Sequence, residues 1–388
     1  MLPGGRRLPV IPLEPFGFPA ALVVLAGVLA GAWAGTNLFR GHDLLAYWDA
    51  AGRLLAGGRL FSPAELSGPI SPFTRLGYLY PPPLAIVLAP LRAAGLGFDA
   101  LGVAWDAAQG GALVLAGLLA LRAGGARSIG LAVVIALVAA PVWWYPERSL
   151  LADGNVGGVI ALLLALAVVP GAVGGAAVGI AALLKVAPAA ALPAVLFGSR
   201  RARAGALAAL GAGLLVCLIV APADTLAVPT VLANLAAGGP GGRFDFGLAA
   251  TLALVAGPDG AAAGHVLGLL GLFGAVAFAV FEARRGRHRT ALVIGAWATL
   301  LVSGTIWIHY LVVAAVPVGL TWNRATPVER GVVAVALASG WAILLPEGSA
   351  HLAFWVAAAA LATVSLRVVA RSEPAADEGP TGWRASAR

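Results

Sequence analysis

Long apolar runs are the feature of this sequence that most constrains its fold. Runs of about 13 to 25 residues follow one another along the 388-residue chain, separated by short groups rich in Arg, Gly and Pro. A helix of about 20 apolar residues spans the hydrocarbon core of a bilayer and satisfies its own backbone hydrogen bonds there. Charged residues make up 11% of the chain, whereas about a quarter is usual in soluble domains. We therefore predict an all-α polytopic membrane protein with about ten to twelve crossings.

The distribution of arginine orients these crossings, because Lys and Arg concentrate in cytoplasmic loops. If every Arg group is cytoplasmic, the chain crosses the membrane an even number of times between consecutive groups. This layout gives twelve crossings, cytoplasmic termini and a signal anchor over about residues 18–38. The groups are Arg6-Arg7, Arg122 with Arg127, Arg200-Arg201-Arg203, Arg284 to Arg289, Arg324 with Arg330, and Arg367 with Arg371.

The segment between Arg127 and Arg200 admits two layouts. In the preferred one, the run over 172–198 consists of two short half-spans that break near Lys185 and Pro188, since proline removes a helix hydrogen bond. Lys185 then faces the outer surface. The alternative makes 80–95 a true span and 172–198 a single one, which leaves Arg122 and Arg127 outside.

The remaining composition restricts the function classes. The net charge of +8 is spread over successive loops, a pattern of membrane topology that predicts no nucleic-acid partner. The single cysteine, Cys217, excludes an internal disulfide. No nucleotide-binding loop and no metal-ligand spacing occur, so we expect neither a cofactor nor a metal.

One transmembrane domain is predicted over 1–372, with a disordered cytoplasmic tail over 373–388. A loop carrying Asp224 and Asp245 is expected after the run over 204–222.

The first outer loop, over about residues 39–83, concentrates polar side chains. From Asp43 to Ala56 its pattern fits an amphipathic helix lying on the membrane, with Asp43 and Tyr47 one turn apart on the same face. Asp43 is therefore a candidate catalytic carboxylate, although a helix cap or a partner for Arg40 would also explain it. Tyr80 lies where the chain re-enters the bilayer. Aromatic residues at that depth commonly anchor a protein at the membrane interface.

Three later positions are further candidates. Lys185 is the only lysine of the chain and lies in an apolar run, where an ionisable side chain is expensive unless it faces a cavity or an anion. His309 lies between two short apolar runs and can be an interface residue or a functional one. Asp153 and Asn155, at the outer end of another span, fit helix caps.

At these positions the sequence resembles glycosyltransferase family 87. The matching motifs run in order from residue 43 to about residue 310. They are Asp43, Tyr47, Ala51, Leu55, Gly57, Leu60 and Phe61, then Tyr80-Pro81-Pro82 and Pro90-Leu91, Gly154-Asn155, Leu184-Lys185-Val186-Ala187-Pro188 followed by Arg200-Arg201, and Trp307-Ile308-His309-Tyr310.

The resemblance implies a GT-C fold that transfers a sugar from a polyprenyl-phosphate donor on the outer face of the plasma membrane. The acceptor would be a glycolipid or a cell-envelope glycan, and the sugar mannose or, alternatively, arabinofuranose. Asp43 matches the family's catalytic carboxylate. For the donor phosphate we expect Lys185, His309 and Arg59, and for substrate binding we expect Tyr47, Tyr80 and Asn155.

Two readings from other classes compete with this one. A transporter or lipid flippase would show titratable residues at the bilayer midplane and inverted repeats, and neither is visible in the sequence. A catalytically silent scaffold of the cell envelope fits the sequence as well. The oligomeric state has no signature in the sequence.

Overall fold

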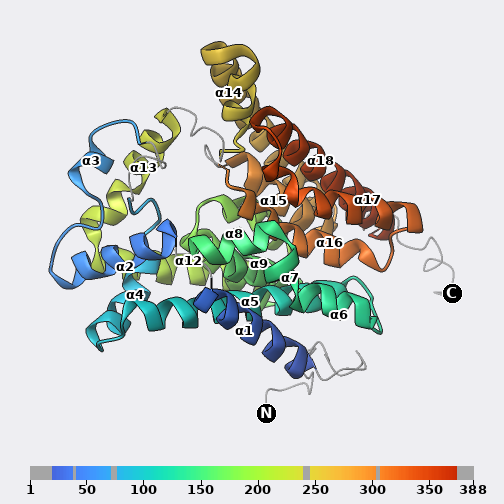
Figure 1. Ribbon diagram of the computed structural model, residues 1–388, viewed down its shortest axis with the longest axis horizontal. Coiled ribbons are helices and arrows are strands. Elements are labelled where there is room, and N and C mark those ends of the chain that lie inside the picture. The colour runs from blue at the N-terminus through green and yellow to red at the C-terminus, as the bar shows by residue number, and fades with distance from the viewer. Residues whose placement is uncertain (1–19, 38–40, 71–76, 239–244, 303–305, 374–388) are drawn as a thin grey trace, which may run out of the picture.

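The computed structural model describes residues 20–37, 41–70, 77–238, 245–302 and 306–373, and within these ranges it is helical with no β-strand (Figure 1). The all-α prediction is thereby confirmed. The helices are α1 (Ala20–Asn37), α2 (His42–Leu55), α3 (Pro63–Leu66), α4 (Pro83–Ala93), α5 (Phe98–Ala123), α6 (Leu131–Val138), α7 (Ala140–Trp143), α8 (Tyr145–Asp153), α9 (Gly157–Leu166), α10 (Ala172–Leu184), η2 (Ala187–Ala191), α11 (Leu192–Leu196), α12 (Arg200–Val220), α13 (Pro222–Ala237), α14 (Leu248–Arg284), α15 (His288–Val302), η4 (Ile308–Ala314), α16 (Ala315–Trp322), α17 (Pro327–Ala338), η5 (Ser339–Leu344) and α18 (Glu347–Ser372).

Six of the described helices are long and apolar enough to cross a membrane: α1, α5, α12, α14, α17 continued by η5, and α18. The pair α8 and α9, bent by 115°, makes a seventh if the two are counted as one span. Four further apolar stretches of 10–17 residues are shorter, namely α4, α10, η2 with α11, and η4 with α16. The chain is therefore a multi-pass membrane protein, and the number of long spans is smaller than the twelve crossings that we predicted.

The predicted break at Lys185 is confirmed. Helix α10 ends at Leu184, and Lys185 has an extended backbone with φ −152° and ψ 131°. The short 3-10 helix η2 then begins at Ala187, with Pro188 in its first turn. Proline at this position lacks the N–H that would continue α10, so the chain changes direction here.

The direction of the neighbouring helices shows that the chain reverses after Lys185. Gly175, near the start of α10, packs against Ala202 at the start of α12, and Leu183 at the end of α10 packs against Gly213, farther along α12. The helices α10 and α12 thus run parallel. Because α10 and α12 run in the same direction, the segment over 185–199 must run back in the opposite direction before α12 begins. This is the arrangement that two short half-spans require.

The predicted outer loop around Asp224 is wrong in part. Asp224 lies in the first turn of α13, 3% exposed, where the positive end of the helix dipole favours a carboxylate. Asp245 lies just before α14 and is buried. The intervening Arg243 lies outside the described residues.

At the C-terminal end of the described residues, Glu373 accepts hydrogen bonds from the backbone of Arg289 and Thr290. The rest of the predicted tail, 374–388, is not described.

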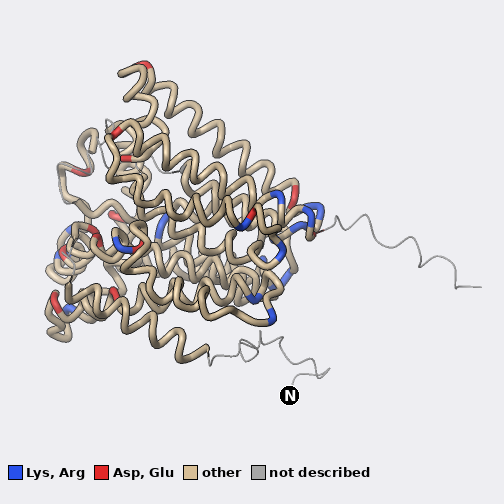
Figure 2. Tube along the Cα trace, turned by 45° about the vertical axis from the view of Figure 1, so that its right-hand side comes forward, with Lys and Arg blue, Asp and Glu red and all other residues tan. Residues whose placement is uncertain are grey.

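The described Arg groups gather at one end of the helix bundle, and most acidic residues lie toward the other end (Figure 2). A side chain at Gly125 would lie 3.8 Å from the guanidinium of Arg324, and Arg371 forms an ion pair of 2.8 Å with Glu329. The loop with Arg122 and Arg127 therefore shares its end with the C-terminal Arg groups. This arrangement supports the preferred layout and disfavours the one that places this loop outside.

Close helix packing is achieved through small residues. Gly31 of α1 lies directly against the backbone oxygen of Asp106 on α5, and Gly110 of α5 lies against the backbone of Gly27. Small residues allow membrane helices to approach closely and gain van der Waals contact. Helix α5 is buried along most of its length and also packs on α9 and α16, so it forms the centre on which α2 and α8 are placed.

Candidate active site

The start of α2 lies on the end of α8, and this contact places Asp43. The N–H of Gly41 donates a hydrogen bond to the carbonyl of Ala152 at 2.5 Å. Gly154 follows α8 with φ +68°, and a Cβ there would lie 2.5 Å from the Cβ of Leu44. Only glycine meets both demands, since it tolerates positive φ and leaves room for the neighbouring helix. Asp43, in the first turn of α2, is thereby held beside Asn155.

Asn155 connects two of the predicted site residues. Its side chain is fully buried, and its Oδ1 accepts a hydrogen bond from the N–H of Gly157 at 3.0 Å. Its Nδ2 donates to Asp43 Oδ2 at 2.5 Å and to the Tyr80 hydroxyl at 3.1 Å. Because the oxygen caps the start of α9, the amide nitrogen must face Asp43, which receives this bond as an acceptor. The N-cap residue of α9 is Val156, so Asn155 lies one residue before the cap position and accepts the N–H of the first residue of the helix.

Asp43 is partly buried and surrounded by charged groups. Burial raises the pKa of Asp43 above its usual value, and the carboxylate of Asp153 adds to this effect. The hydrogen bond from Asn155 and the nearby charges of His309 and Lys185 act in the opposite direction. A carboxylate with a raised pKa is better suited to accept a proton than an exposed one.

Lys185 points its ammonium group at aromatic rings. Its Nζ lies 3.7 Å from the ring centroid of Tyr310 and 5.6 Å from that of Tyr80. Cation–π contacts partly replace lost hydration, and the C-terminus of α10 also favours a positive charge there. None of the described carboxylates forms an ion pair with Lys185, so its charge faces the site without a neutralising carboxylate in contact.

His309 lies on η4 with 1% of its surface exposed. Its Nδ1 is 3.2 Å from Asp153 Oδ2. It borders a small cavity of about 30 Å³ that Asn155, Lys185, Thr299 and Tyr310 also line. Three different parts of the chain therefore converge on one hollow beside Asp43.

Two other predicted residues have different positions. Tyr47 is fully buried and packs edge-on against Tyr80, with ring centroids 4.8 Å apart, so it supports the wall of the site. Arg59 donates from Nε to Asp224 Oδ1 at 2.8 Å and from Nη2 to the carbonyl of Ala223. The structure thus holds Arg59 against α13 and does not bring it to Asp43.

Two residues of the cluster were missed as site residues. Asp153 fits a helix cap by its position in the sequence, but it is the last residue of α8 and contacts His309 instead of capping α9. Tyr310 is adjacent to His309, so the aromatic segment 307–310 carried a signal for it. For Asp153 the only signal was its place two residues before Asn155.

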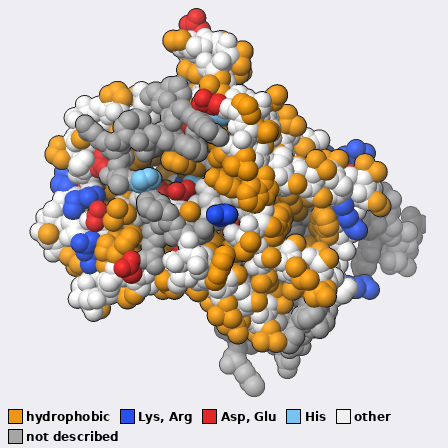
Figure 3. Space-filling model, in the orientation of Figure 1, with side chains coloured by type: hydrophobic (Ala, Val, Ile, Leu, Met, Phe, Trp, Pro, Cys, Tyr) orange, Lys and Arg blue, Asp and Glu red, His pale blue; other side chains and the backbone are white. Residues whose placement is uncertain are grey.

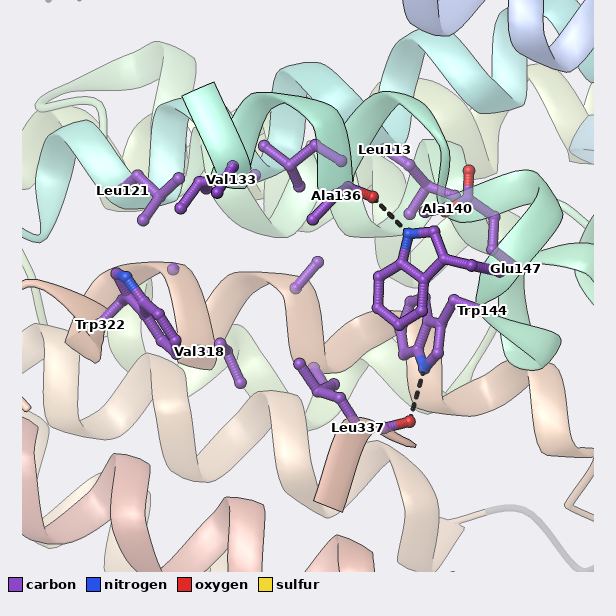
Figure 4. A pocket seen from close by; sticks show the side chains of 17 residues that line it. Leu113, Leu121, Val133, Ala136, Ala140, Trp144, Glu147, Val318, Trp322 and Leu337 are labelled. Atoms are coloured by element: carbon purple, nitrogen blue, oxygen red, sulfur yellow. Dashed lines mark hydrogen bonds between the residues drawn. The ribbon is translucent and has the colours of Figure 1, made fainter. Parts of the chain in front are cut away.

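The face shown in Figure 3 has basic, acidic and His side chains on its left side, while hydrophobic side chains dominate the right. A second hollow, of about 340 Å³, lies between α5, α6 and α16 and is apolar, with Trp144 and Trp322 among its lining residues (Figure 4). The side chain of Glu147 borders it, and its Oε1 is buried without a hydrogen bond to any described residue.

Among the described residues no group of three or more His, Cys, Asp and Glu side chains is placed to hold a metal ion. The chemistry that the cluster offers with its own groups is a carboxylate with raised pKa beside a lysine and a buried histidine. Such a set can accept a proton at one point and stabilise negative charge at another.

Comparison with known proteins identifies the family. The chain matches glycosyltransferase family 87 over residues 78–304, more than half of its length. This range contains Tyr80, Asn155 and Lys185, while Asp43 precedes it and His309 follows it. No curated protein and no solved structure gave a significant match. On the extent of the family match, the chain belongs to glycosyltransferase family 87 and is a multi-pass membrane glycosyltransferase.

Proposed function

We propose that the chain transfers a sugar, mannose in the first instance, from a polyprenyl-phosphate donor to a glycolipid or a cell-envelope glycan. Arabinofuranose is the alternative sugar. The observation that carries this proposal is that Lys185 and His309 line one cavity, while Asp43 is hydrogen-bonded to Asn155 of the same lining. Such a transfer needs a base at one end and positively charged or hydrogen-bond-donating groups at the other.

Asp43 acts as the general base. The acceptor hydroxyl is a weak nucleophile, and Asp43 takes its proton as the acceptor oxygen attacks C1 of the sugar. The bond between C1 and the phosphate oxygen breaks, and its electron pair leaves with the lipid phosphate. A single displacement inverts the anomeric centre, so a β-linked donor gives an α-linked product.

Lys185 and His309 receive the charge that develops on the leaving phosphate. Positively charged donors aimed at developing negative charge stabilise the transition state most when they are already in place. Lys185 meets this condition because Tyr80 and Tyr310 hold its ammonium group without neutralising it. Arg59, which is bound to Asp224, is not included.

The active site faces the extracytoplasmic side in this proposal. The Arg groups gather at one end of the bundle, while most acidic residues lie toward the other end (Figure 2), and positively charged loops stay in the cytoplasm. The twelve crossings then comprise the six long helices and six shorter segments: α6 with α7, α9, α10, η2 with α11, α15, and η4 with α16.

A panel of radiolabelled donors tests this function. Purified protein in proteoliposomes would be incubated with polyprenyl-phosphate mannose, polyprenyl-phosphate arabinofuranose or a nucleotide sugar, together with a membrane glycolipid extract. We expect labelled glycolipid with a polyprenyl-phosphate sugar and none with the nucleotide sugar. Transfer from the nucleotide sugar alone would contradict the proposed donor. Movement of intact donor across the bilayer without product would favour a flippase.

A further inference from the structure

The roles proposed for Asp43 and Lys185 do not account for the contact between Asp153 and His309. Asp153, at the end of α8, places Oδ2 3.2 Å from His309 Nδ1 and accepts a hydrogen bond from Ser149 Oγ at 3.2 Å. Ser149 lies one turn earlier on the same helix. It therefore holds the carboxylate in one orientation toward the histidine.

The imidazole ring also has two aromatic neighbours. The ring of Trp307 lies nearly parallel to it, with centroids 6.1 Å apart and an angle of 13°. Tyr310 contacts it edge-on at 5.1 Å. A ring fixed in this way keeps Nδ1 on Asp153, which leaves Nε2 on the other edge of the ring.

His309 Nε2 is buried and makes no hydrogen bond with any residue that the structure describes. An unsatisfied buried polar atom is unfavourable, and in a cavity wall it can be satisfied by a group that enters the cavity. The cavity beside it is also lined by Lys185 and Asn155. A ligand group that reaches His309 Nε2 from this cavity would also lie next to the lysine.

The charges of the cluster specify the kind of partner. Asp43 and Asp153 contribute two carboxylates, and Lys185 contributes a positive charge at the cavity. An imidazole whose Nδ1–H is bound by a carboxylate presents Nε2 to the ligand, and when the ring is protonated Nε2 becomes a donor. A phosphate oxygen beside Lys185 can accept that hydrogen bond.

We propose that Asp153 is a positioning residue, which holds His309 by Nδ1 so that Nε2–H donates to the phosphate of the lipid donor. This inference rests on the proposed function. Asp153 does not touch the substrate, and it acts only through His309. Removal of Asp153 should therefore weaken binding of the phosphate. It should have no further effect in a protein that already lacks the His309 side chain.

The test is a double-mutant cycle with Asp153→Ala, His309→Gln and the double variant. Inhibition by free polyprenyl phosphate and turnover would both be measured. A catalytic group displaced by about 1 Å can lose about 10²-fold in rate, and we expect a loss of this order with a raised inhibition constant for Asp153→Ala. The double variant should be no worse than His309→Gln alone. Asp153→Asn keeps an acceptor oxygen and should recover part of the loss.

Asp49→Asn is the matched control, because Asp49 is exposed on α2 and lies 3.8 Å from Arg92. Gel filtration and thermal unfolding in detergent would show that each variant is folded. Wild-type inhibition constants in a folded Asp153→Ala variant would overturn the inference, and so would additive losses in the double variant. If the wild-type protein is not inhibited by polyprenyl phosphate at all, the proposed donor itself is wrong and the inference fails with it.

Discussion

At the scale of single residues, Asp43 makes the pH dependence predictable. Burial raises the pKa of this carboxyl above its ordinary value of about 3.9. A general base works only when ionised, so turnover should fall as the pH drops through the raised pKa. Turnover measured from about pH 4 to about pH 8 should show this loss above the ordinary carboxyl value. Turnover that stays constant down to about pH 4 would contradict the role of Asp43.

Lys185 supports a second prediction at this scale. Lys185→Met should leave the protein folded but raise the inhibition constant of polyprenyl phosphate, since the charge over Tyr310 is lost. Lys185→Arg should restore only part of the affinity, because a planar guanidinium replaces a compact ammonium. Arg367→Met, at an exposed position at the other end of the bundle, is the control. An unchanged inhibition constant in Lys185→Met would show that the lysine does not bind the phosphate.

The residue patterns predicted some contacts of the site and missed others for a physical reason. Asp43 and Tyr47 on one face follow from helical periodicity, and the expense of a buried lysine singles out Lys185. The ion pair of Arg59 with Asp224 joins residues 165 positions apart, and only tertiary packing brings them together. The role of Asp153 likewise depends on where η4 lies.

At the scale of elements, the contact between α1 and α5 depends on glycine. A side chain at Gly31 would overlap the backbone oxygen of Asp106, and forced overpacking typically costs about 1–3 kcal/mol. Gly31→Leu should lower the midpoint of thermal unfolding in detergent. Gly211→Leu, at a position on α12 with nothing within 4 Å, should change it little. Equal midpoints for the two variants would show that α1 does not pack as described.

The elements themselves were predictable to different degrees. The break after α10 was foreseen because Pro188 cannot continue a helix, and the surface helix α2 was foreseen from its alternating faces. Helix α13 was missed, because its few polar residues and the expected membrane exit at Pro222 favoured a loop. Apolar composition marks where helices can form, but it does not distinguish a full crossing from a half-span.

At the scale of the whole molecule, the common end of the Arg groups predicts the topology. In a Cys217→Ala background, a cysteine at Gly125 should resist a membrane-impermeant thiol reagent added to intact cells, because Gly125 lies beside Arg324. A cysteine at Gly57, exposed at the end of α2, should be labelled. Labelling at position 125 but not at position 57 would show that the protein has the opposite orientation in the membrane.

The function of the whole molecule rests on Asp43, and one variant tests it. Because the folded protein holds a proton on Asp43 more tightly than the unfolded chain does, this carboxyl contributes stability that is lost as the pH rises through its raised pKa. At neutral pH, Asp43→Asn should therefore unfold at the same or a higher temperature. The amide keeps an oxygen that can accept the hydrogen bond of Asn155.

The most direct measurement is the single-turnover rate of sugar transfer from radiolabelled polyprenyl-phosphate mannose to a glycolipid acceptor, with wild-type protein and with Asp43→Asn. Loss of a general base typically costs about 10²–10⁴-fold. We expect a loss in this range for the variant, while inhibition by polyprenyl phosphate stays close to that of the wild type. A folded Asp43→Asn variant that transfers the sugar at the wild-type rate would contradict the account.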